Sequence, residues 1–269
     1  MIHTSPVSSL APAGGPRIAI VTVCLNDLCG LQSTFESVRA QTLPPHQWIV
    51  ADGQSTDGTQ AWLGTLDWPL LRWSSGRDGG IYQGMNKGLR EVEAEYVLFL
   101  NSGDVLCDAD VLKDVAAALA SSASPPSLLY GDSYEVDTQG RAFLRRARPA
   151  WWAWLGMPTT HQAMYFRRDA LPEGFDTRYR WSGDYAAVTR LYLAHRGADI
   201  AHLPRPLCRF HLGGRSDQNR RSFLRENLEI RRRVLGMSAP PAYMLHAAHH
   251  VQGWIKKYVP AVHRAFRYG

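Results

Sequence analysis

Lysine is almost absent from this chain: 4 of its 30 basic residues are lysine and the others are arginine, with a formal net charge of +6. The planar guanidinium of arginine suits phosphate groups, so this composition favours anionic ligands or anionic lipid over neutral partners. Zinc-finger spacing, RNA-binding aromatic motifs and helix-turn-helix patterns are missing as well. We therefore expect no nucleic-acid partner.

Cysteine is also scarce, and its spacing contains no CxxC pair. The cysteines are Cys24, Cys29, Cys107 and Cys208, and three of the four lie in or beside apolar runs. Buried free thiols in a reducing cytosol are the expected state.

Long hydrophobic runs are absent, since none approaches the ~20 residues that span a bilayer. Residues 1–15 lack the charged and apolar regions of a signal peptide, and their Ser, Pro, Ala and Gly content predicts a loose tail. Hydrophobic residues make up 45% and charged residues 20% of the 269, as in an ordinary globular protein. We expect a cytoplasmic protein with one large domain or a domain with a small appendage.

Strands and helices alternate through the first part of the chain. Short apolar runs predict strands at residues 17–25, 48–52, 70–74 and 96–100, and helical spacing predicts helices at 28–39, from 56 or 57 to 66, at 81–92 and at 108–120. Such alternation indicates an α/β fold with a Rossmann-like, mostly parallel central sheet and flanking helices.

The amino-acid composition changes at residues 121–127, which are rich in Ser and Pro. Beyond them the pattern predicts a hairpin, a tryptophan-rich loop, further strands and a C-terminal helical extension. The hairpin spans 128–136 and 142–146, the loop 149–158, the strands 161–166 and 200–210, and the helices 181–195, 220–235 and 242–259.

Polar residues follow the predicted strands of the first part. Right-handed crossovers place Asn26, Asp52, Ser75 and Asp104 along one edge of the sheet. Ligands of open α/β sheets bind at this edge, and Asp104 offers a hard oxygen to a divalent cation that carries a phosphate group. Taken alone, residues 101–104 fit a simple turn before the next helix equally well.

Several short segments, in this order, resemble the family 2 glycosyltransferases with the GT-A fold, over roughly residues 18–237. They are 21–26 (VTVCLN), 49–59 (IVADGQSTDGT), 78–88 (DGGIYQGMNKG), 100–104 (LNSGD), His161-Gln162, 182–185 (SGDY) and 213–216 (GGRS). Each segment is weak alone, and the ordered set is specific. The LNSGD and His-Gln segments are most similar to the exopolysaccharide and colanic-acid type of sugar transferase.

The resemblance implies an inverting transferase in which Asp184 is the catalytic base. Without the resemblance, Asp184 would be an ordinary acidic residue at a helix N-terminus. It also implies Mg²⁺ or Mn²⁺ at Asp104. His211 is a weak candidate for a further metal ligand, and ordering of the loop that follows it is the favoured alternative. Family members usually carry Asp-x-Asp or Asp-x-Asp-Asp where this chain has Asn101-Ser102-Gly103-Asp104, which leaves the strength of the metal dependence open.

The same matches imply contacts to a nucleotide-sugar donor, UDP-sugar being favoured. The implied donor contacts are Thr22, Asn26, Asp52, Arg77, Asp78, Asn101 and Ser102. His161, Gln162 and Trp152 are the expected contacts to the acceptor or the donor sugar. Asp57 is expected to cap a helix instead. The tryptophan loop fits two alternatives equally well: its rings could cover the hydrophobic core, or they could stack on sugar rings.

Two other functions stay open on the sequence. A nucleotidyltransferase also uses an acidic, Rossmann-like site, but residues 23–30 lack its glycine-rich phosphate loop with a lysine. A catalytically weak nucleotide-sugar-binding subunit fits the thinned acidic motif, but such a protein has no need of a base.

The predicted organisation is a tail (1–15), a GT-A domain (16–237) and an amphipathic basic extension (238–269). Within the domain, 16–125 should bind the nucleotide sugar and 126–237 the acceptor. In the extension, the predicted apolar stripe is Met244, Ala247, Ala248, Val251, Ile255 and Val259, with Trp254 and Tyr258 beside it and Lys256, Lys257, Arg264 and Arg267 near its end.

This stripe predicts a helix in the interface of an anionic membrane, and packing of the stripe on the domain is the alternative. The resemblance implies a polyprenyl-diphosphate-linked glycan as acceptor. The expected location is therefore peripheral, on the inner face of the cytoplasmic membrane.

Overall fold

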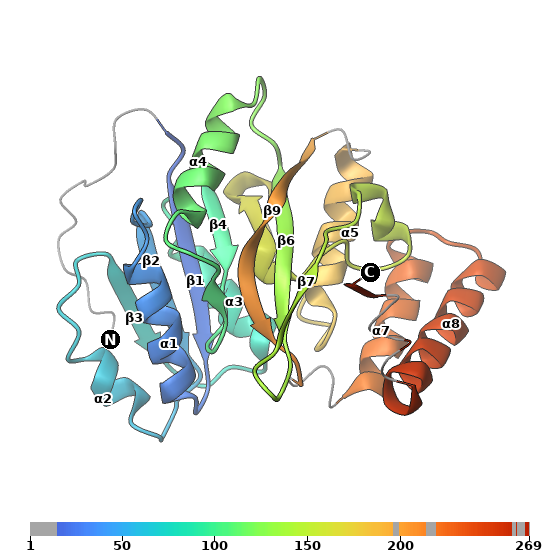
Figure 1. Ribbon diagram of the computed structural model, residues 1–269, viewed down its shortest axis with the longest axis horizontal. Coiled ribbons are helices and arrows are strands. Elements are labelled where there is room, and N and C mark those ends of the chain that lie inside the picture. The colour runs from blue at the N-terminus through green and yellow to red at the C-terminus, as the bar shows by residue number, and fades with distance from the viewer. Residues whose placement is uncertain (1–14, 196–198, 214–218, 260–261, 263–266, 269) are drawn as a thin grey trace.

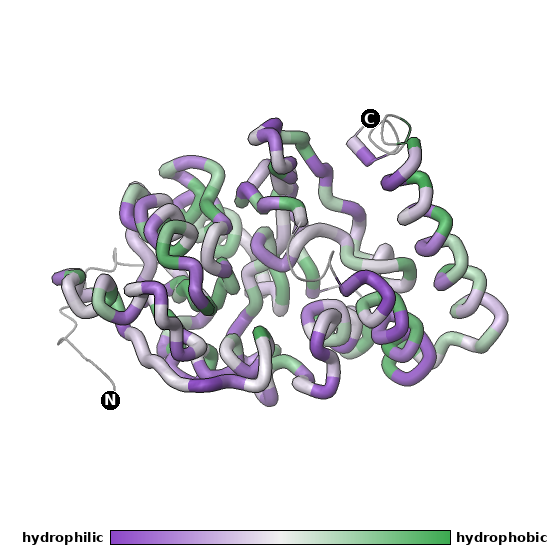
Figure 2. Tube along the Cα trace, turned by 90° about the horizontal axis from the view of Figure 1, so that it is seen from below, coloured by the Kyte–Doolittle hydropathy of each residue, from purple (hydrophilic) through white to green (hydrophobic). Residues whose placement is uncertain are grey.

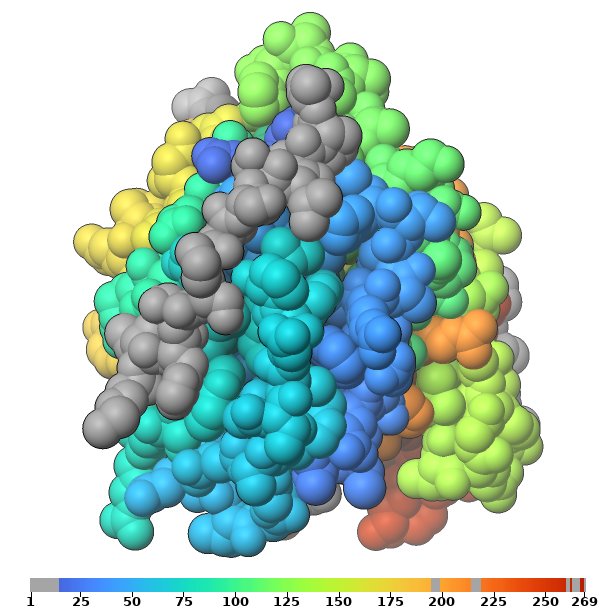
Figure 3. Space-filling view, turned by 90° about the vertical axis from the view of Figure 1, so that its left-hand side faces the viewer, coloured from blue at the N-terminus to red at the C-terminus, as the bar shows by residue number. Residues whose placement is uncertain are grey.

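The computed structural model describes residues 15–195, 199–213, 219–259, 262, 267 and 268. The tail predicted at 1–15 lies outside these residues except for Gly15, as do Arg264 and most of the segment 213–216. Helices cover both faces of a central sheet (Figure 1). Seen from the side of β3 and α2, residues of the first part of the chain form most of the surface (Figure 3).

The described strands are β1 (Ile18–Cys24), β2 (Gln47–Asp52), β3 (Leu71–Ser75), β4 (Tyr96–Phe99), β5 (Val105–Leu106), β6 (Leu128–Val136), β7 (Ala142–Arg145), β8 (Met164–Arg167) and β9 (Ile200–His211). The described α-helices are α1 (Leu28–Arg39), α2 (Thr59–Leu63), α3 (Ile81–Arg90), α4 (Val111–Ser121), α5 (Gly183–His195), α7 (Arg220–Arg233) and α8 (Ala239–Tyr258). Short 3-10 helices are η1 (Ala150–Trp154), η2 (His161–Ala163) and η3 (Arg168–Ala170).

The described strands form one sheet of nine in the order β3-β2-β1-β4-β8-β6-β9-β5, with β7 paired to β6. The first half is parallel, as predicted, because β1 pairs in parallel with β2 and β4, and β2 with β3. The second half of the sheet is mixed. The predicted hairpin is the antiparallel pair of β6 and β7. β8 runs antiparallel between β4 and β6, β5 pairs antiparallel with β9, and β9 lies parallel to β6.

Alternate residues of the central strands feed two separate cores. In β1, Ile18 and Ile20 pack with Leu31 of α1 in the core that also holds α4. Ala19 and Val21 point to the opposite face, where α3 and α5 pack. Successive side chains of a strand point to opposite faces, so a nearly continuous apolar run is what a strand covered on both sides requires.

Two glycines let α3 lie directly against β1. A Cβ on Gly88 would lie 2.4 Å from Val21 Cγ1, and a Cβ on Gly84 would lie 3.1 Å from Val23 Cγ1. This close approach brings the first turn of α3 over the carboxyl ends of the parallel strands, where polar residues gather.

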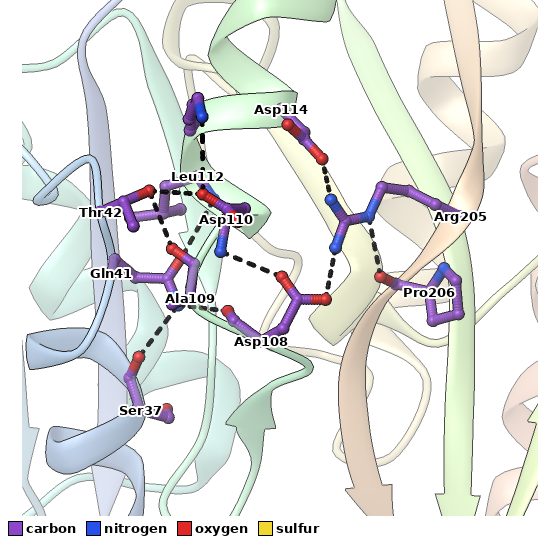
Figure 4. Close-up of polar contacts among 11 residues, drawn as sticks. Ser37, Gln41, Thr42, Asp108, Ala109, Asp110, Leu112, Asp114, Arg205 and Pro206 are labelled. Carbon is purple, nitrogen blue, oxygen red and sulfur yellow. Dashed lines mark hydrogen bonds and ion pairs between the residues drawn. The ribbon is translucent and has the colours of Figure 1, made fainter.

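A polar cluster fixes the connection between β4 and α4 (Figure 4). Arg205 of β9 donates to Asp108 Oδ2 at 2.6 Å and also to the carboxylate of Asp114. Gln41, just after α1, donates to the Asp108 carbonyl at 2.6 Å and accepts from the Leu112 N–H at 3.1 Å. These contacts tie the start of α4 to both halves of the sheet.

The end of the chain returns to the β6–β7 hairpin. Glu135 of β6 is fully buried, and its carboxylate accepts from Arg145 at 3.3 Å, from Arg267 Nε at 2.7 Å and from Tyr268 Oη at 2.6 Å. The Tyr268 ring stacks on Phe143 with 5.0 Å between centroids. Burial acts to raise the pKa of Glu135, but these partners lower it to about 2.

Helix α8 packs on α7 through its small and histidine residues. Arg220 donates to the His249 carbonyl at 2.6 Å, and a Cβ on Gly253 would lie 2.4 Å from Arg220 Nε. None of the described helices combines the length and the hydropathy that crossing a bilayer requires. The cysteines are free, as predicted. The expected burial holds for Cys24 and Cys208, whereas Cys107 is half-buried and Cys29 is exposed.

We predict that Glu135→Gln lowers the free energy of unfolding at neutral pH by about 1.5–3 kcal/mol, since hydrogen bonds to charged groups are lost inside the fold. The pKa of Glu135 lies below its ordinary value of 4.5 in the folded protein. Its stabilisation is therefore complete above that value and is lost as the pH falls toward about 2.

Urea unfolding of both proteins between about pH 5 and pH 2 should show their difference shrinking. Asp137→Asn is the matched control, because Asp137 pairs with the exposed Arg141 at the hairpin loop and such pairs contribute about 0–1 kcal/mol. A constant difference across this pH range would contradict the assignment.

Candidate active site

Asp184 lies in the first turn of α5, where side chains from two other elements reach it. Its Oδ1 accepts from Tyr82 Oη of α3 and from the Tyr185 backbone N–H, both at 2.8 Å. Its Oδ2 lies 3.2 Å from His161 Nδ1 of η2. The side chain is 17% exposed, so the carboxylate is anchored inside the protein and still meets solvent.

Burial acts to raise the pKa of Asp184, but the hydrogen bond and positive field of His161, with the Tyr82 and Tyr185 donors, lower it below 3.8. The carboxylate is therefore ionised at neutral pH. Burial and the charge of Asp184 raise the pKa of Tyr82 well above its ordinary value, so the phenol stays protonated and donates.

Tyr82 was missed among the predicted site residues, although its segment was recognised. A Cβ on Gly183 would lie 2.9 Å from the Tyr82 ring. A glycine directly before the acidic residue was therefore a readable signal that another side chain packs against this backbone.

Glu226 of α7 was also missed, and it holds the segment that leads to Asp184. Its carboxylate accepts from the backbone N–H groups of Arg180 at 3.0 Å, Trp181 at 2.8 Å and Ser182 at 2.9 Å. These N–H groups directly precede α5, which begins at Gly183, so Glu226 fixes the segment that leads into the helix. No local pattern reveals such a contact, because the partners are more than forty residues apart.

Asp104, the predicted metal ligand, lies in the turn after β4 and is 6% exposed. Its Oδ2 accepts from Gln162 Nε2 at 2.7 Å. Burial raises its pKa to about 6, against the Gln162 hydrogen bond and the positive fields of His161 and His211. His211 ends β9, and its Nδ1 lies 3.1 Å from the Gly103 carbonyl oxygen, so the fold brings the two predicted ligands to one turn.

The oxygens at this turn suit a hard cation, but they do not form a cage. Among the described residues, no three His, Cys, Asp or Glu side chains are grouped to hold a metal ion. The buried Asn101 Oδ1 has no hydrogen-bond partner, and with the Asp104 carboxylate it is the kind of ligand that Mg²⁺ and Mn²⁺ prefer. This set fits a cation whose remaining ligands come from the substrate and water.

The parallel strands β1, β2 and β3 end at the same edge of the sheet, as predicted, and hydrogen bonds connect their ends. Asp52, which ends β2, is 2% exposed, and its Oδ2 accepts from the Ser55 N–H at 3.0 Å and Ser75 Oγ at 2.5 Å. Asn26 follows β1 in the left-handed conformation, with φ of 52°, and its Oδ1 accepts from the Thr56 N–H at 2.8 Å.

Asp78 and Arg77 lie beside this edge in the loop after β3. Asp78 Oδ2 lies 3.3 Å from where a Cβ on Gly53 would stand, so it faces the loop after Asp52. Lys87 of α3 donates to the Arg77 carbonyl at 2.8 Å, while the Arg77 side chain is exposed. Lys87 thus fixes the backbone of this loop, and the guanidinium of Arg77 is accessible to a ligand.

Ser102, another predicted donor contact, lies in a loop that is hydrogen-bonded to a helix-capping residue. Ser102 Oγ donates to Asp27 Oδ2 at 2.7 Å, and Asp27 caps α1. The N-cap of α2 is Gly58, one residue after the predicted Asp57. Asp57 still accepts from the Thr59 N–H at 3.1 Å and from the Leu28 N–H at 2.8 Å.

The prediction that Thr22 contacts the nucleotide is wrong. Its side chain is fully buried inside β1, and its hydroxyl accepts from Trp48 Nε1 at 2.9 Å. A donor in the site cannot touch a hydroxyl that β2 covers, so Thr22 fixes the two strands to each other.

The expected sugar contacts are engaged within the protein. His161 Nε2 lies 3.0 Å from Asn101 Nδ2, so both of its ring nitrogens have partners. Gln162 is buried against Asp104.

The tryptophan loop packs on α5. Trp152 lies in η1, half-buried, with the Arg148 guanidinium carbon 5.3 Å from its ring centre. The Tyr185 hydroxyl donates to the Ala153 carbonyl at 2.9 Å. Trp151 of the same turn is 52% exposed.

The architecture is a mixed α/β, GT-A-like fold with a curled sheet and flanking helices. Staphylococcus aureus TarS, residues 1–349, in complex with UDP superposes with a TM-score of 0.64 at 18% identity, over 84% of this chain and 68% of that one. The mannosyltransferase PcManGT from Pyrobaculum calidifontis, with GDP-Man and Mn²⁺, gives 0.63 at 19% identity, over 93% and 72%.

The sequence identifies the family to which the chain belongs. The model of Glycosyl transferase family 2 matches residues 19–175, more than half of the chain, and the chain belongs to this family.

Curated relatives agree with this assignment. An uncharacterized glycosyltransferase of Mycobacterium tuberculosis is 38% identical over 117 residues, which is 43% of this chain and 44% of that protein. A PGL/p-HBAD biosynthesis glycosyltransferase of Mycobacterium bovis is 29% identical over 180 residues, or 63% and 67%. The match thus spans less than half the length of the first relative.

Proposed function

We propose that this protein is an inverting glycosyltransferase that moves a sugar from a nucleotide-diphosphate sugar, UDP-sugar favoured, to a hydroxyl of a glycan acceptor. The supporting observation is Asp184, an ionised and anchored carboxylate that still meets solvent at the open end of the sheet. A protein that only binds nucleotide sugars has no use for such a group.

The chain's own residues supply the parts that this reaction needs. Asp184 accepts the proton of the acceptor hydroxyl as its oxygen attacks the anomeric carbon from the face opposite the leaving nucleotide. Asp52 and Asp78 accept from hydroxyls or N–H groups of the nucleotide or the donor sugar, and Arg77 offers a cation to phosphate. Residues 16–125 thus form the donor half and 126–237 the acceptor half.

A Mg²⁺ or Mn²⁺ ion, when bound, would neutralise charge on the departing diphosphate. Asp104 would hold it, with His211 as a weaker ligand. PcManGT, a structural neighbour, has been solved with GDP-Man and Mn²⁺, which supports a divalent cation.

The acceptor in this proposal is a glycan on a polyprenyl-diphosphate carrier, in exopolysaccharide or cell-surface polysaccharide biosynthesis. Asn26, Asn101 and Ser102 border the donor, and His161, Gln162 and Trp152 border the transferred sugar or the acceptor.

Helix α8 supports work at an anionic membrane surface. Tyr243, Met244, Val251, Trp254 and Tyr258 are each 57–67% exposed. Apart from Ile255, which is half-buried, the predicted stripe is exposed, and α8 meets α7 through its other side. Hydrophobic residues recur along this outermost helix (Figure 2).

The residues around this face carry the matching charge. Lys256 and Lys257 lie in its last turn, and the neighbouring α7 exposes Arg221, Arg225 and Arg232. Aromatic rings beside basic residues suit the headgroup region of an anionic bilayer. We therefore place the enzyme as a peripheral protein on the inner face of the cytoplasmic membrane.

Asp184→Asn should abolish transfer and leave nucleotide-sugar binding nearly unchanged. Loss of a general base typically lowers the rate ~10²–10⁴-fold. The measurement is release of nucleotide from UDP-, GDP- and dTDP-sugars with acceptor present, beside a donor-binding titration. Near wild-type turnover in the variant would refute the proposed function.

Asp104→Ala should weaken metal-dependent donor binding, because a carboxylate is the strongest hard-oxygen ligand at this turn. Calorimetry with UDP alone and with UDP plus Mn²⁺ measures this, and EDTA should suppress transfer by the wild-type protein. Full activity in chelator would mean that the cationic side chains alone stabilise the leaving group.

The α8 surface is tested by Trp254→Ala with Tyr258→Ala in the full-length protein. Both side chains are exposed, so folding should be preserved, while co-sedimentation with anionic vesicles at low salt should fall and donor hydrolysis should be spared. Trp151→Ala is the matched control, an exposed tryptophan outside α8.

Wild-type binding should also be reversed by raising the salt concentration. Unchanged vesicle binding by the double variant would exclude this face. A change in molar mass by light scattering would assign it to a second copy of the chain instead.

A further inference from the structure

Asn101 and His161 meet because of the order of the strands. β4 and β8 are antiparallel neighbours, with Leu98 opposite Tyr165. The turn that follows β4 and the η2 turn that precedes β8 therefore lie at the same end of the sheet. This places Asn101 Nδ2 3.0 Å from His161 Nε2, on the side of the ring away from Asp184.

His161 joins the Asn101 turn to the base. Its Nε2 faces Asn101, and its Nδ1 lies 3.2 Å from Asp184 Oδ2. The ring is therefore held between the two side chains.

The same contacts use most of the carboxylate of Asp184. An ionised carboxylate has about four lone-pair positions. Tyr82 and the Tyr185 N–H take Oδ1, and His161 takes one position on Oδ2. The hydrogen bonds of the described residues leave the second position on Oδ2 to a ligand.

We propose that Asn101 and His161 are positioning residues for the base. Asn101 holds the His161 ring in place, and His161 turns Asp184 so that the remaining position on Oδ2 faces the acceptor hydroxyl. In the reaction, the hydroxyl proton moves to Oδ2, the hydroxyl oxygen bonds to the anomeric carbon, and the nucleotide diphosphate leaves with the bonding electron pair. This inference rests on the proposed role of Asp184.

A matched pair of variants separates positioning from shape. The side-chain N–H of Asn reaches the place of Nδ1, and that of Gln reaches the place of Nε2. His161→Asn should keep the donor to Asp184 and most of kcat. His161→Gln and His161→Phe should lower kcat about 10-fold to 100-fold, part of the ~10²–10⁴ that a base contributes, with the KM of donor and acceptor nearly unchanged.

Each other outcome overturns the proposal. A raised KM with unchanged kcat would make His161 a sugar contact. Equal losses in the Asn and Gln variants, with thermal unfolding shifted in both, would make it a structural residue. If Asp184→Asn is inactive while His161→Phe has wild-type kcat, this inference fails and the proposed function stands.

The role of Asn101 is tested by Asn101→Leu, which is similar in size and removes the amide that faces His161 Nε2. It should lower kcat, with the KM of donor and acceptor nearly unchanged.

An Asn101→Leu variant with wild-type kcat would overturn the role of Asn101. So would an Asn101→Asp variant that is more active at low Mn²⁺, because that result would assign position 101 to the cation.

Discussion

The carboxylate of Asp184 is the point at which three separate elements of the fold, α3, η2 and α7, act together. Tyr82 reaches it from α3, which packs on the parallel half of the sheet, and His161 reaches it from η2 in the mixed half. Glu226 of α7 fixes the backbone that carries it. A largely buried charge is costly without donors, so its stability in this place depends on all three elements holding their positions.

The sequence was sufficient for the parallel half and for the residues at its edge. Each strand there is an apolar run that ends in a polar residue, and covered parallel strands produce this pattern locally. The second half was harder, because β8 enters between β4 and β6 and the two-residue β5 has no periodicity to read. The Asn101–His161 contact follows from that insertion and was therefore out of reach. The predicted nucleotide contact of Thr22 was wrong for a related reason, since only the register of β1 on β2 brings Trp48 over its side chain.

The arginine-rich composition indicated anionic ligands, but many of these arginines have structural partners. Arg17 pairs with Glu95 and Arg72 with Glu93. Arg231 is fully buried, and it donates to the Leu155 carbonyl at 2.7 Å beneath the tryptophan loop. Guanidinium groups suit such sites because their donors stay charged and point in fixed directions. A count of arginines therefore predicts a ligand only after these partners are known, and Arg77 at the strand edge and the exposed arginines of α7 keep that role.

The two C-terminal helices are connected to the site more directly than an appended segment would be. α7 holds the Asp184 segment through Glu226 and holds α8 through Arg220. Still closer to the C-terminus, Arg267 is bound to Glu135 of the hairpin. Because α7 joins α8 to the Asp184 segment, a lipid surface that held the exposed face of α8 would orient the domain. In the proposed reaction, that orientation would decide how the open end of the sheet, with Asp184, meets an acceptor carried in the membrane.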